Sequence, residues 1–210
     1  MEIISHRGYW KVESEKNKNI AFDRSFKLGF GTETDLRDYN GELVISHDIA
    51  NSSSILIDDF LKNYKSIKTD LTLALNIKSD GLQLKLLQAL KKYNVTNYFV
   101  FDMSIPDSIG YIKNHFNVFT RVSEYENSPA FYKDIKGIWL DSFKSIWYSK
   151  EMILEQLNKG KKVAIVSNEL HKRDKFILWN QLRKWNLDKE NNIILCTDFP
   201  EEAKIFFKDE

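Results

Sequence analysis

The sequence predicts an α/β fold, a single (β/α)8 (TIM) barrel that spans residues 1–210. Two observations predict it: eight short β-like runs recur along the 210 residues, and helical patterns fill the gaps between them. Runs of consecutive Ile, Val, Leu and Phe are typical of strands buried on both faces, as in a parallel sheet covered by helices. A doubly wound open sheet is the structural alternative, because strand counting separates the two folds poorly.

The predicted strands follow the β-like runs, and the tight-turn signal Asn40-Gly41 adds a hairpin strand after the second of them. They are Glu2–Ser5, Thr32–Arg37, Glu42–Ile45, Leu71–Ile77, Tyr98–Phe101, Val118–Arg121, Gly137–Leu140, Lys162–Val166 and Ile193–Cys196.

The predicted helices lie between these strands, and the clearest is at 82–90, where leucines recur at helical spacing. They are Ile20–Leu28, Ile57–Tyr64, Leu82–Tyr93, Ser108–His115, Lys150–Asn158, Lys172–Trp185 and Glu201–Lys208. After the fifth strand only the short segment Asn127–Lys133 is available for a helix, and Pro129 interrupts it.

Charge and composition argue against nucleic-acid binding, an intramolecular disulfide and a membrane anchor. The 31 basic and 30 acidic side chains give a net charge of +1, which argues against a broad nucleic-acid interface. Cys196 is the single cysteine, so no intramolecular disulfide can form. Neither a signal-peptide pattern nor an apolar run of membrane-spanning length is present, so we expect a cytoplasmic protein without a stable membrane anchor. The sequence indicates no oligomeric state.

Glu33 and Asp35 are two residues apart on a predicted strand, so their side chains point to the same face. Two carboxylates buried side by side repel each other, and a divalent cation removes that cost. Mg²⁺ and Ca²⁺ prefer such oxygen ligands. The alternative is a pair of exposed carboxylates at a sheet edge, but the pattern around Thr34 lacks a hydrophobic inner face. The pattern therefore favours a metal site.

His6 and His47 each follow an apolar run directly, at the end of a predicted strand. Two imidazoles beside a substrate can act as general base and general acid in phosphoryl transfer. Arg7, next to His6, offers a planar fork for phosphate oxygens. Taken singly, each residue is more often structural, and it is their shared placement at strand ends that favours a catalytic site.

Five segments carry a family resemblance: His6-Arg7-Gly8, Asn19-Ile20-Ala21-Phe22, Gly29 through Asp35, Asn40 through Asp48, and Cys196 through Pro200. In order and spacing they resemble the glycerophosphodiester phosphodiesterase family, within the phosphatidylinositol-phospholipase-C-like barrels. The N-terminal third of the chain carries the dense part of the resemblance, and the middle follows the family mainly in strand rhythm.

The resemblance implies a (β/α)8 barrel and one divalent cation, Mg²⁺ or Ca²⁺. It implies that His6 and His47 are the acid–base pair and that Glu33 and Asp35 bind the metal. It further implies that Arg7 holds the phosphate of a small-molecule substrate, with Lys78 adding positive charge. The implied reaction hydrolyses a glycerophosphodiester or related polar phosphodiester to a phosphomonoester and an alcohol, a step of lipid metabolism.

Two departures from the family are visible. Asn76 stands where the family usually has a third metal-binding carboxylate, and Asp102 is a candidate to compensate, although it could instead cap a helix. Only residues 48–75 separate His47 from Asn76, so this is a compact member without the usual inserted domain.

The remaining substrate contacts are therefore expected from other loops. Polar residues follow the later strands, and Arg121, Asp141 and Trp139 are the candidates for substrate binding. Each taken alone is more often a loop or core residue. Together they suit a hydroxyl-rich or charged leaving group better than a lipid tail.

Two other functions stay open at this point. Related barrels act as lyases that close a cyclic phosphate with a neighbouring substrate hydroxyl. A non-catalytic barrel that binds a phosphate ligand is the second alternative, because Asn76 removes one negative charge from the metal site.

Overall fold

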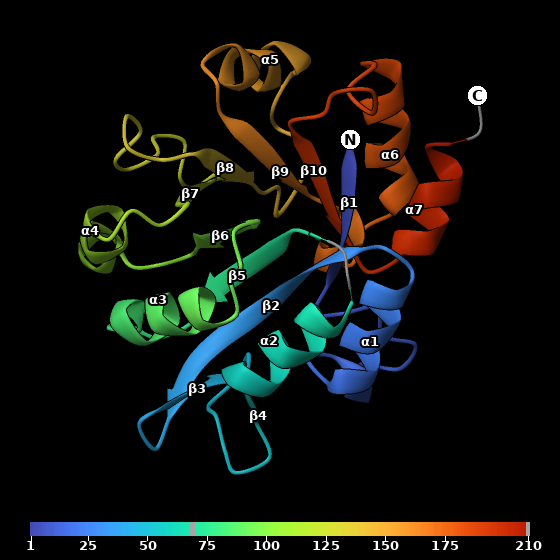
Figure 1. Ribbon diagram of the computed structural model, residues 1–210. Helices are drawn as coiled ribbons and strands as arrows, with labels where there is room; N and C mark the ends of the chain where they lie inside the picture. Colours follow the sequence, from blue (N-terminus) through green and yellow to red (C-terminus); the bar gives the residue numbers. More distant parts are fainter. Residues whose placement is uncertain (68–69, 209–210) are drawn as a thin grey trace. The chain divides into compact units, whose positions relative to one another are not determined.

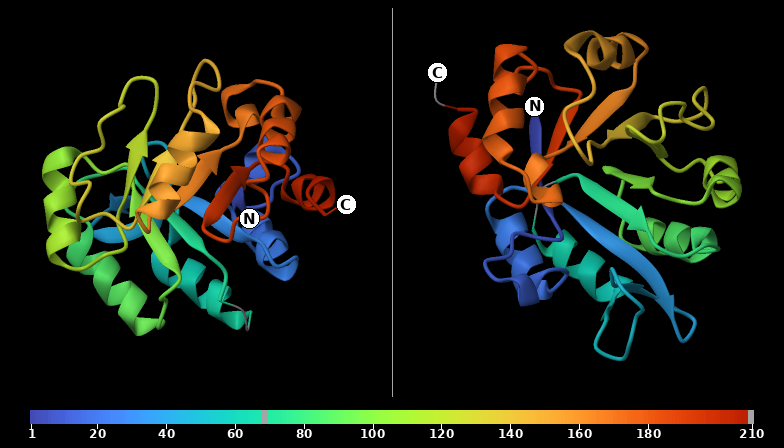
Figure 2. Two further views of the ribbon diagram at one scale, coloured as in Figure 1. Left: turned by 90° about the horizontal axis from the view of Figure 1, so that it is seen from above. Right: turned by 180° about the vertical axis from the view of Figure 1, so that it is seen from behind.

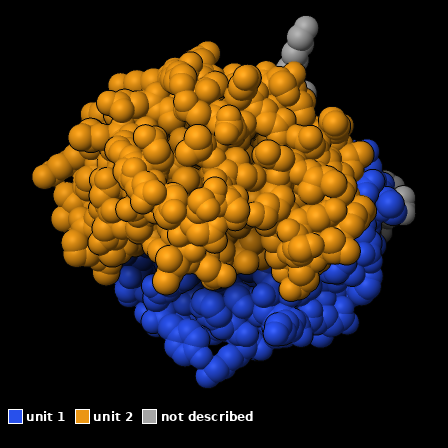
Figure 3. Space-filling view, turned by 90° about the horizontal axis from the view of Figure 1, so that it is seen from below, with its two compact units in different colours: residues 1–4, 119–210 blue, residues 5–118 orange. Residues whose placement is uncertain are grey.

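A computed structural model describes residues 1–67 and 70–208 of the chain. The chain contains two compact units, which Figure 3 colours separately: unit 1 comprises residues 1–4 and 119–210, and unit 2 comprises residues 5–118. The predicted domain 1–210 includes residues 68–69 and 209–210, which lie outside the described part, and the single domain stays a prediction.

Strands and helices alternate along most of the chain (Figure 1). In order they are β1 (Glu2–His6), a 3₁₀ turn (Glu13–Glu15), α1 (Asn19–Lys27), β2 (Gly31–Tyr39), β3 (Glu42–Ile45), β4 (Ile55–Leu56), α2 (Ile57–Ser66), β5 (Leu73–Ile77), α3 (Gln83–Lys92), β6 (Tyr98–Phe101), α4 (Ile105–Lys113), β7 (Phe119–Val122), β8 (Gly137–Leu140), α5 (Lys150–Asn158), β9 (Lys162–Val166), a second 3₁₀ turn (Asn168–His171), α6 (Lys175–Lys184), β10 (Ile193–Thr197) and α7 (Pro200–Phe206). All nine predicted strands are present, with shifts of one or two residues at some ends.

Unit 2 contains a mixed sheet built around β2. On one side β2 pairs in parallel with β5, which pairs in parallel with β6, and on the other side it pairs antiparallel with β3. The register places Asp35 opposite Asn76. Because residues 31–36 of β2 are all buried, this strand carries its polar side chains into the interior of the unit.

Helices α1 and α2 lie side by side in Figures 1 and 2, and aromatic rings fill the space between them. The Phe60 ring of α2 meets Phe22 of α1 edge-on at 4.7 Å between centroids, and Tyr64 meets Phe26 at 5.4 Å. All four side chains are almost fully buried. Edge-to-face pairs of this kind stabilise a core beyond the area that they bury.

Unit 1 contains four parallel strands in the order β7, β8, β9 and β10. Helices α6 and α7 pack together through Trp179, whose ring lies 5.4 Å from that of Phe206. The Trp179 indole N–H donates to the Ser167 hydroxyl at 2.9 Å, so this large side chain is buried with its polar atom satisfied.

The helix predicted at Ser108–His115 begins earlier, at Ile105. The Ser104 hydroxyl accepts the Asp107 N–H at 3.3 Å, and Pro106 occupies the first turn. Both features start a helix, because the first turn has N–H groups without helical partners. Ser104 is thus the cap of α4, and the capping alternative weighed for Asp102 is wrong.

The helix predicted at Lys172–Trp185 is also divided differently. Lys172 adopts a left-handed φ of 58° and ends a 3₁₀ turn, and α6 begins only at Lys175, where Asp174 accepts the Phe176 N–H at 2.9 Å. The segment Asn127–Lys133 forms a bend and turns in place of a helix. Strand β4 was not predicted, because two residues carry no readable period.

The aromatic cluster between α1 and α2 makes a stability prediction. Phe60→Ala should lower the free energy of unfolding by about 3–5 kcal/mol, because it leaves a cavity among buried rings. Leu84→Ala on α3 is the control: Leu84 is exposed, so its truncation should change stability by less than about 0.5 kcal/mol. Urea denaturation measures both variants, and equal losses would contradict this account of the core.

Candidate active site

The two predicted metal carboxylates lie together in unit 2. Glu33 is 2% exposed and Asp35 is fully buried. Arg7 contacts both: its backbone N–H donates to Glu33 Oε2 at 3.2 Å, and its Nε lies 3.1 Å from Asp35 Oδ2. The carboxylates therefore face the same side of β2, as their spacing in the sequence predicts.

A strained turn after β1 places Arg7 there. Arg7 has a φ of 57° and Gly8 a φ of 79°, two successive residues in the left-handed region. The turn is held by Arg7 N–H to Glu33 O at 3.0 Å and Gly8 N–H to Thr32 Oγ1 at 2.9 Å. A Cβ on Gly8 would lie 2.7 Å from Ala21 Cβ, so this position requires glycine. Arginine rarely adopts such backbone angles, and strain of this kind concentrates at functional sites.

Positive charge surrounds Asp35. Besides Arg7, Lys78 Nζ lies 3.4 Å from Asp35 Oδ1, and the Asn17 amide donates to Asp35 Oδ2 at 2.8 Å. These contacts offset the cost of keeping a carboxylate away from water. Lys78 thus lies beside a buried carboxylate, and its role toward a phosphate stays a prediction.

Among the described residues, Glu33 has no comparable neutralising partner at close range. Burial, and then the charge of Asp35, raise the pKa of Glu33 from 4.5 to about 7. His6 opposes this shift, with Nε2 at 4.0 Å from Glu33 Oε2, and Arg7 and Lys78 oppose it further. The shift makes Glu33 a candidate functional group, since it combines desolvation with a specific charged partner.

Asn76 and Asp102 lie next to each other at the ends of β5 and β6. The Asn76 amide donates to Asp102 Oδ2 at 3.2 Å. The Asn76 amide oxygen is buried and accepts no hydrogen bond from the described residues, and Asp35 Oδ1 has the Lys78 ion pair but no hydrogen bond from them. Buried polar atoms in this state call for a ligand or an ion.

The residues fit a hard divalent cation. Glu33, Asp35 and the Asn76 amide supply oxygen atoms, the ligand type that Mg²⁺ and Ca²⁺ prefer. Within residues 1–67 and 70–208, no group of three or more His, Cys, Asp or Glu side chains is arranged to hold a metal ion. The buried Asn76 amide oxygen is therefore the candidate third protein ligand beside Glu33 and Asp35.

His47 lies beside a cavity of about 340 Å³ that Arg7 and Asn17 also line. The His47 side chain is 42% exposed, and its Nδ1 lies 2.8 Å from Asp48 Oδ1. This hydrogen bond lowers the pKa of the Asp48 carboxyl and orients the ring. Because Arg7 lines the same cavity, the structure connects His47 with the carboxylate cluster.

Asn17 belongs to the candidate site, although the sequence did not indicate it as a site residue. Its side chain is nearly buried and bridges two residues of β2, since Thr34 Oγ1 donates to Asn17 Oδ1 at 2.9 Å while the amide donates to Asp35. Nothing in the run Lys16-Asn17-Lys18-Asn19 separates this asparagine from its neighbour Asn19.

The three predicted substrate-binding residues of the later strands belong to unit 1. Arg121 Nε lies 2.5 Å from Glu126 Oε2, and Trp139 is 5% exposed within β8. Asp141 Oδ1 lies 2.6 Å from His171 Nε2, a carboxylate–imidazole pair that the sequence did not reveal, because thirty positions separate the two residues. Their role toward a substrate stays a prediction.

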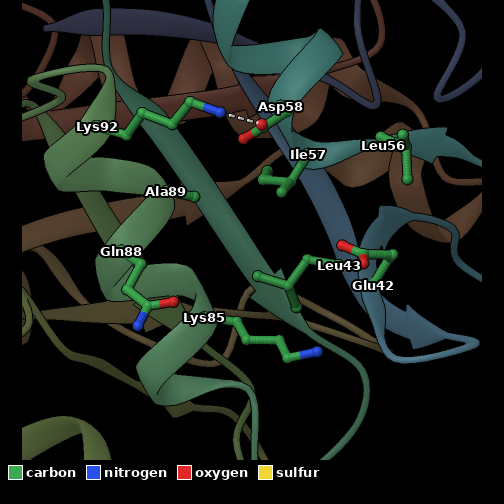
Figure 4. Close-up of a pocket in the computed structure, with 9 residues that line it drawn as sticks. All are labelled: Glu42, Leu43, Leu56, Ile57, Asp58, Lys85, Gln88, Ala89 and Lys92. Atoms are coloured by element: carbon green, nitrogen blue, oxygen red, sulfur yellow. Dashed lines mark hydrogen bonds and ion pairs between the residues drawn. The ribbon is translucent and has the colours of Figure 1, made fainter.

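A second cavity of unit 2, about 400 Å³, lies between α3 and the β3–β4 hairpin (Figure 4). Leu43 and Ile57 line it, and three of its charged groups have partners: Lys92 pairs with Asp58, and Lys85 donates to the Gly41 carbonyl. It is larger than the cavity beside His47, but it holds none of the predicted site residues, so we assign the chemistry to the smaller one.

Comparison by sequence finds no match: no family model and no curated protein matches the chain. Comparison by structure finds several solved structures with a similar fold. A proposed glycerophosphodiester phosphodiesterase of Galdieria sulphuraria aligns with a TM-score of 0.76 at 17% identity, over 99% of this chain and 98% of that chain. The glycerophosphodiester phosphodiesterase of Thermotoga maritima gives 0.69 at 16%, over 99% and 97%. An Oleispira antarctica phosphodiesterase in complex with the product sn-glycerol-3-phosphate gives 0.72 at 13%, over 100% and 97%.

The chain has the glycerophosphodiester phosphodiesterase fold. This agrees with the resemblance drawn from the motifs around His6, Glu33 and His47. In the described part of the chain, no helix has both the length and the apolar character that a membrane crossing requires.

The raised pKa of Glu33 predicts how the metal-free glycerophosphodiester phosphodiesterase fold responds to pH. The folded-state pKa of about 7 lies above the unfolded value of 4.5, so the stability that protonated Glu33 confers is complete below about pH 4.5 and is lost as the pH rises toward 7. The loss should be on the order of 3 kcal/mol. Urea denaturation in chelator across this range measures it, and Glu33→Gln should lack this component. Parallel curves for the two proteins would contradict the assignment.

Proposed function

We propose that this chain is a metal-dependent phosphodiester hydrolase that acts on a glycerophosphodiester or a related polar phosphodiester. The observation that carries the proposal is the cluster of Glu33, Asp35 and the unsatisfied Asn76 oxygen, with His6 and Arg7 beside it. The glycerophosphodiester phosphodiesterase fold supports the reaction class. The same fold supports a closed (β/α)8 barrel for this chain, and we include it in the proposal together with a cytoplasmic location.

Glu33, Asp35 and Asn76 would hold one divalent cation, Mg²⁺ or Ca²⁺. When bound, the cation supplies positive charge to a phosphate oxygen. Asp102 would orient the amide, since its hydrogen bond to the Asn76 amide nitrogen directs the amide oxygen away from itself. A direct ligand role for Asp102 stays a prediction.

Arg7 and Lys78 would neutralise the negative charge that develops on the phosphoryl oxygens. Both cations already lie within 3.4 Å of Asp35, so their side chains are held at the site before substrate arrives. Groups fixed in advance around a developing charge need no reorganisation during the reaction. Arg121, Asp141 and Trp139 would contribute substrate contacts from the strand ends of unit 1.

The two histidines would move the protons. One removes a proton from the attacking water, and the other donates a proton to the oxygen of the leaving alcohol. The Asp48 carboxylate at Nδ1 of His47 leaves Nε2 of that ring for the substrate.

Replacement of either histidine should remove turnover. His6→Ala and His47→Ala should each lower kcat by about 10²-fold to 10⁴-fold in a phosphodiester assay with Mg²⁺, while circular dichroism shows an intact fold. His115→Asn is the control, because His115 is exposed at the end of α4 with a φ of 59°, which asparagine tolerates. Near-full activity in both alanine variants would remove the histidines from the mechanism.

The metal ligands make a separate prediction that calorimetry can test without turnover. Glu33→Gln and Asn76→Ala should each weaken Mg²⁺ or Ca²⁺ binding by about tenfold or more, because each removes an oxygen ligand. Asn76→Asp should restore or increase affinity relative to Asn76→Ala, since it returns a carboxylate. Unchanged affinity in Glu33→Gln would exclude Glu33 from the ligand set.

A further inference from the structure

We infer that the cavity beside His47 receives one alcohol arm of the phosphodiester and selects a polyhydroxy alcohol without positive charge. The inference rests on the proposed phosphodiesterase function. The cavity measures about 340 Å³, within the usual range for a small-molecule site, and lies between residues 7–18 and 45–54. Since Arg7 and His47 both line it, a phosphodiester held by Arg7 extends one arm into it.

The outer wall of this cavity is a short loop that β4 anchors. Strand β4 pairs with β3, with Ile55 opposite Ile45, so residues 46–54 form a closed loop. The loop is braced internally: Asn51 Oδ1 accepts the Ser53 N–H at 2.9 Å and the Ser53 hydroxyl at 2.7 Å. The Ser54 hydroxyl accepts the Asn51 N–H at 3.2 Å. The wall therefore presents fixed polar groups, which can form hydrogen bonds with the hydroxyls of a ligand. An apolar chain would remove water from these groups without replacing the hydrogen bonds, so its binding is disfavoured.

Among the described residues that line the cavity, one cationic side chain, Lys18, has no carboxylate partner. Lys16 Nζ lies 3.1 Å from Glu13 Oε1, while Asp48 bonds to His47. Arg7 contacts Asp35. Lys18 lines the cavity, is exposed and has no carboxylate within 4.0 Å in the described part of the chain. Its ammonium group therefore favours a neutral or anionic arm and repels a cationic one.

Tyr9 and Trp10 belong to the segment 7–18 that contributes to the cavity, but neither ring lines it, and each is covered by a cation of this chain. Lys11 Nζ lies 3.9 Å from the centre of the Tyr9 ring, and Lys16 Nζ lies 4.3 Å from the Trp10 ring. A quaternary ammonium is usually recognised by stacking aromatic faces around it. Among the described residues that line the cavity there is no Phe, Tyr or Trp, so a choline arm finds no such stacking surface there.

The test compares three phosphodiesters with the full chain in saturating Mg²⁺: glycerophosphoinositol, glycerophosphocholine and bis(4-nitrophenyl) phosphate. We expect kcat/KM for glycerophosphoinositol to exceed that for glycerophosphocholine by about tenfold or more. Lys18→Glu should reduce this ratio about fivefold, chiefly through KM, because a carboxylate attracts the choline ammonium. Lys27→Glu makes the same charge change on the exposed end of α1, away from the cavity, and should keep the wild-type ratio.

The outcomes separate the two proposals. Equal kcat/KM values for the inositol and choline esters, or a ratio that Lys18→Glu does not move, would overturn this inference and leave the phosphodiesterase proposal standing. A failure to hydrolyse any of the three compounds with Mg²⁺, Ca²⁺ or Mn²⁺ would overturn the proposed function, and the inference with it. If Lys18→Glu does not fold, Ser53→Ala tests the same wall and should also lower the ratio.

Discussion

Two carboxylates on one face of a buried strand repel each other, and much of unit 2 is arranged around this constraint. Glu33 and Asp35 lie in β2 with almost no exposure to water. Arg7 and Lys78 reach Asp35 from the ends of two other strands, within 3.4 Å. Glu33 is left less compensated, and its pKa rises to about 7 in consequence. A core arranged only for stability would replace such a pair with apolar side chains, so its presence points to a positively charged ligand.

The turn at Arg7 and Gly8 places Arg7 beside the carboxylates of β2. Two successive residues in the left-handed region reverse the chain directly after β1, and Gly8 has no room for a side chain. The Arg7 N–H and guanidinium are thereby directed to different carboxylates of the same strand. The turn also begins the loop that forms one wall of the cavity beside His47. One strained segment therefore connects the metal-binding carboxylates, the phosphate contact and the pocket for the alcohol arm.

Several residues of the candidate site were proposed before the structure, because they lie at or near strand ends in a recognisable order, and their roles stay predictions. The alternation at Glu33 and Asp35 and the position of His47 at a strand end follow from local patterns, whereas Lys78 was indicated by the family resemblance. Other parts were not readable. Asn17 looks like any loop asparagine until its contact with Asp35 is seen, and Asp141 gives no sign that it pairs with His171. The predicted start of one helix was also wrong, because its first residue was set by a capping side chain and not by the apolar period. Ser104 caps α4, so the helix begins at Ile105, three residues before the predicted start at Ser108.

The sequence by itself determined the α/β alternation, the position of nearly every strand, and the carboxylate and histidine set on which the proposed chemistry depends. These features are local: side-chain period, turn residues and spacing suffice to specify them. Only the tertiary structure decided which charges meet, that the Asn76 oxygen is buried without a hydrogen bond, and that Lys18 alone among the cations lining the cavity lacks a carboxylate partner in the described residues. Those facts depend on through-space distances between residues far apart in the chain, and the electrostatic energies that follow vary with distance and burial, which no local pattern encodes.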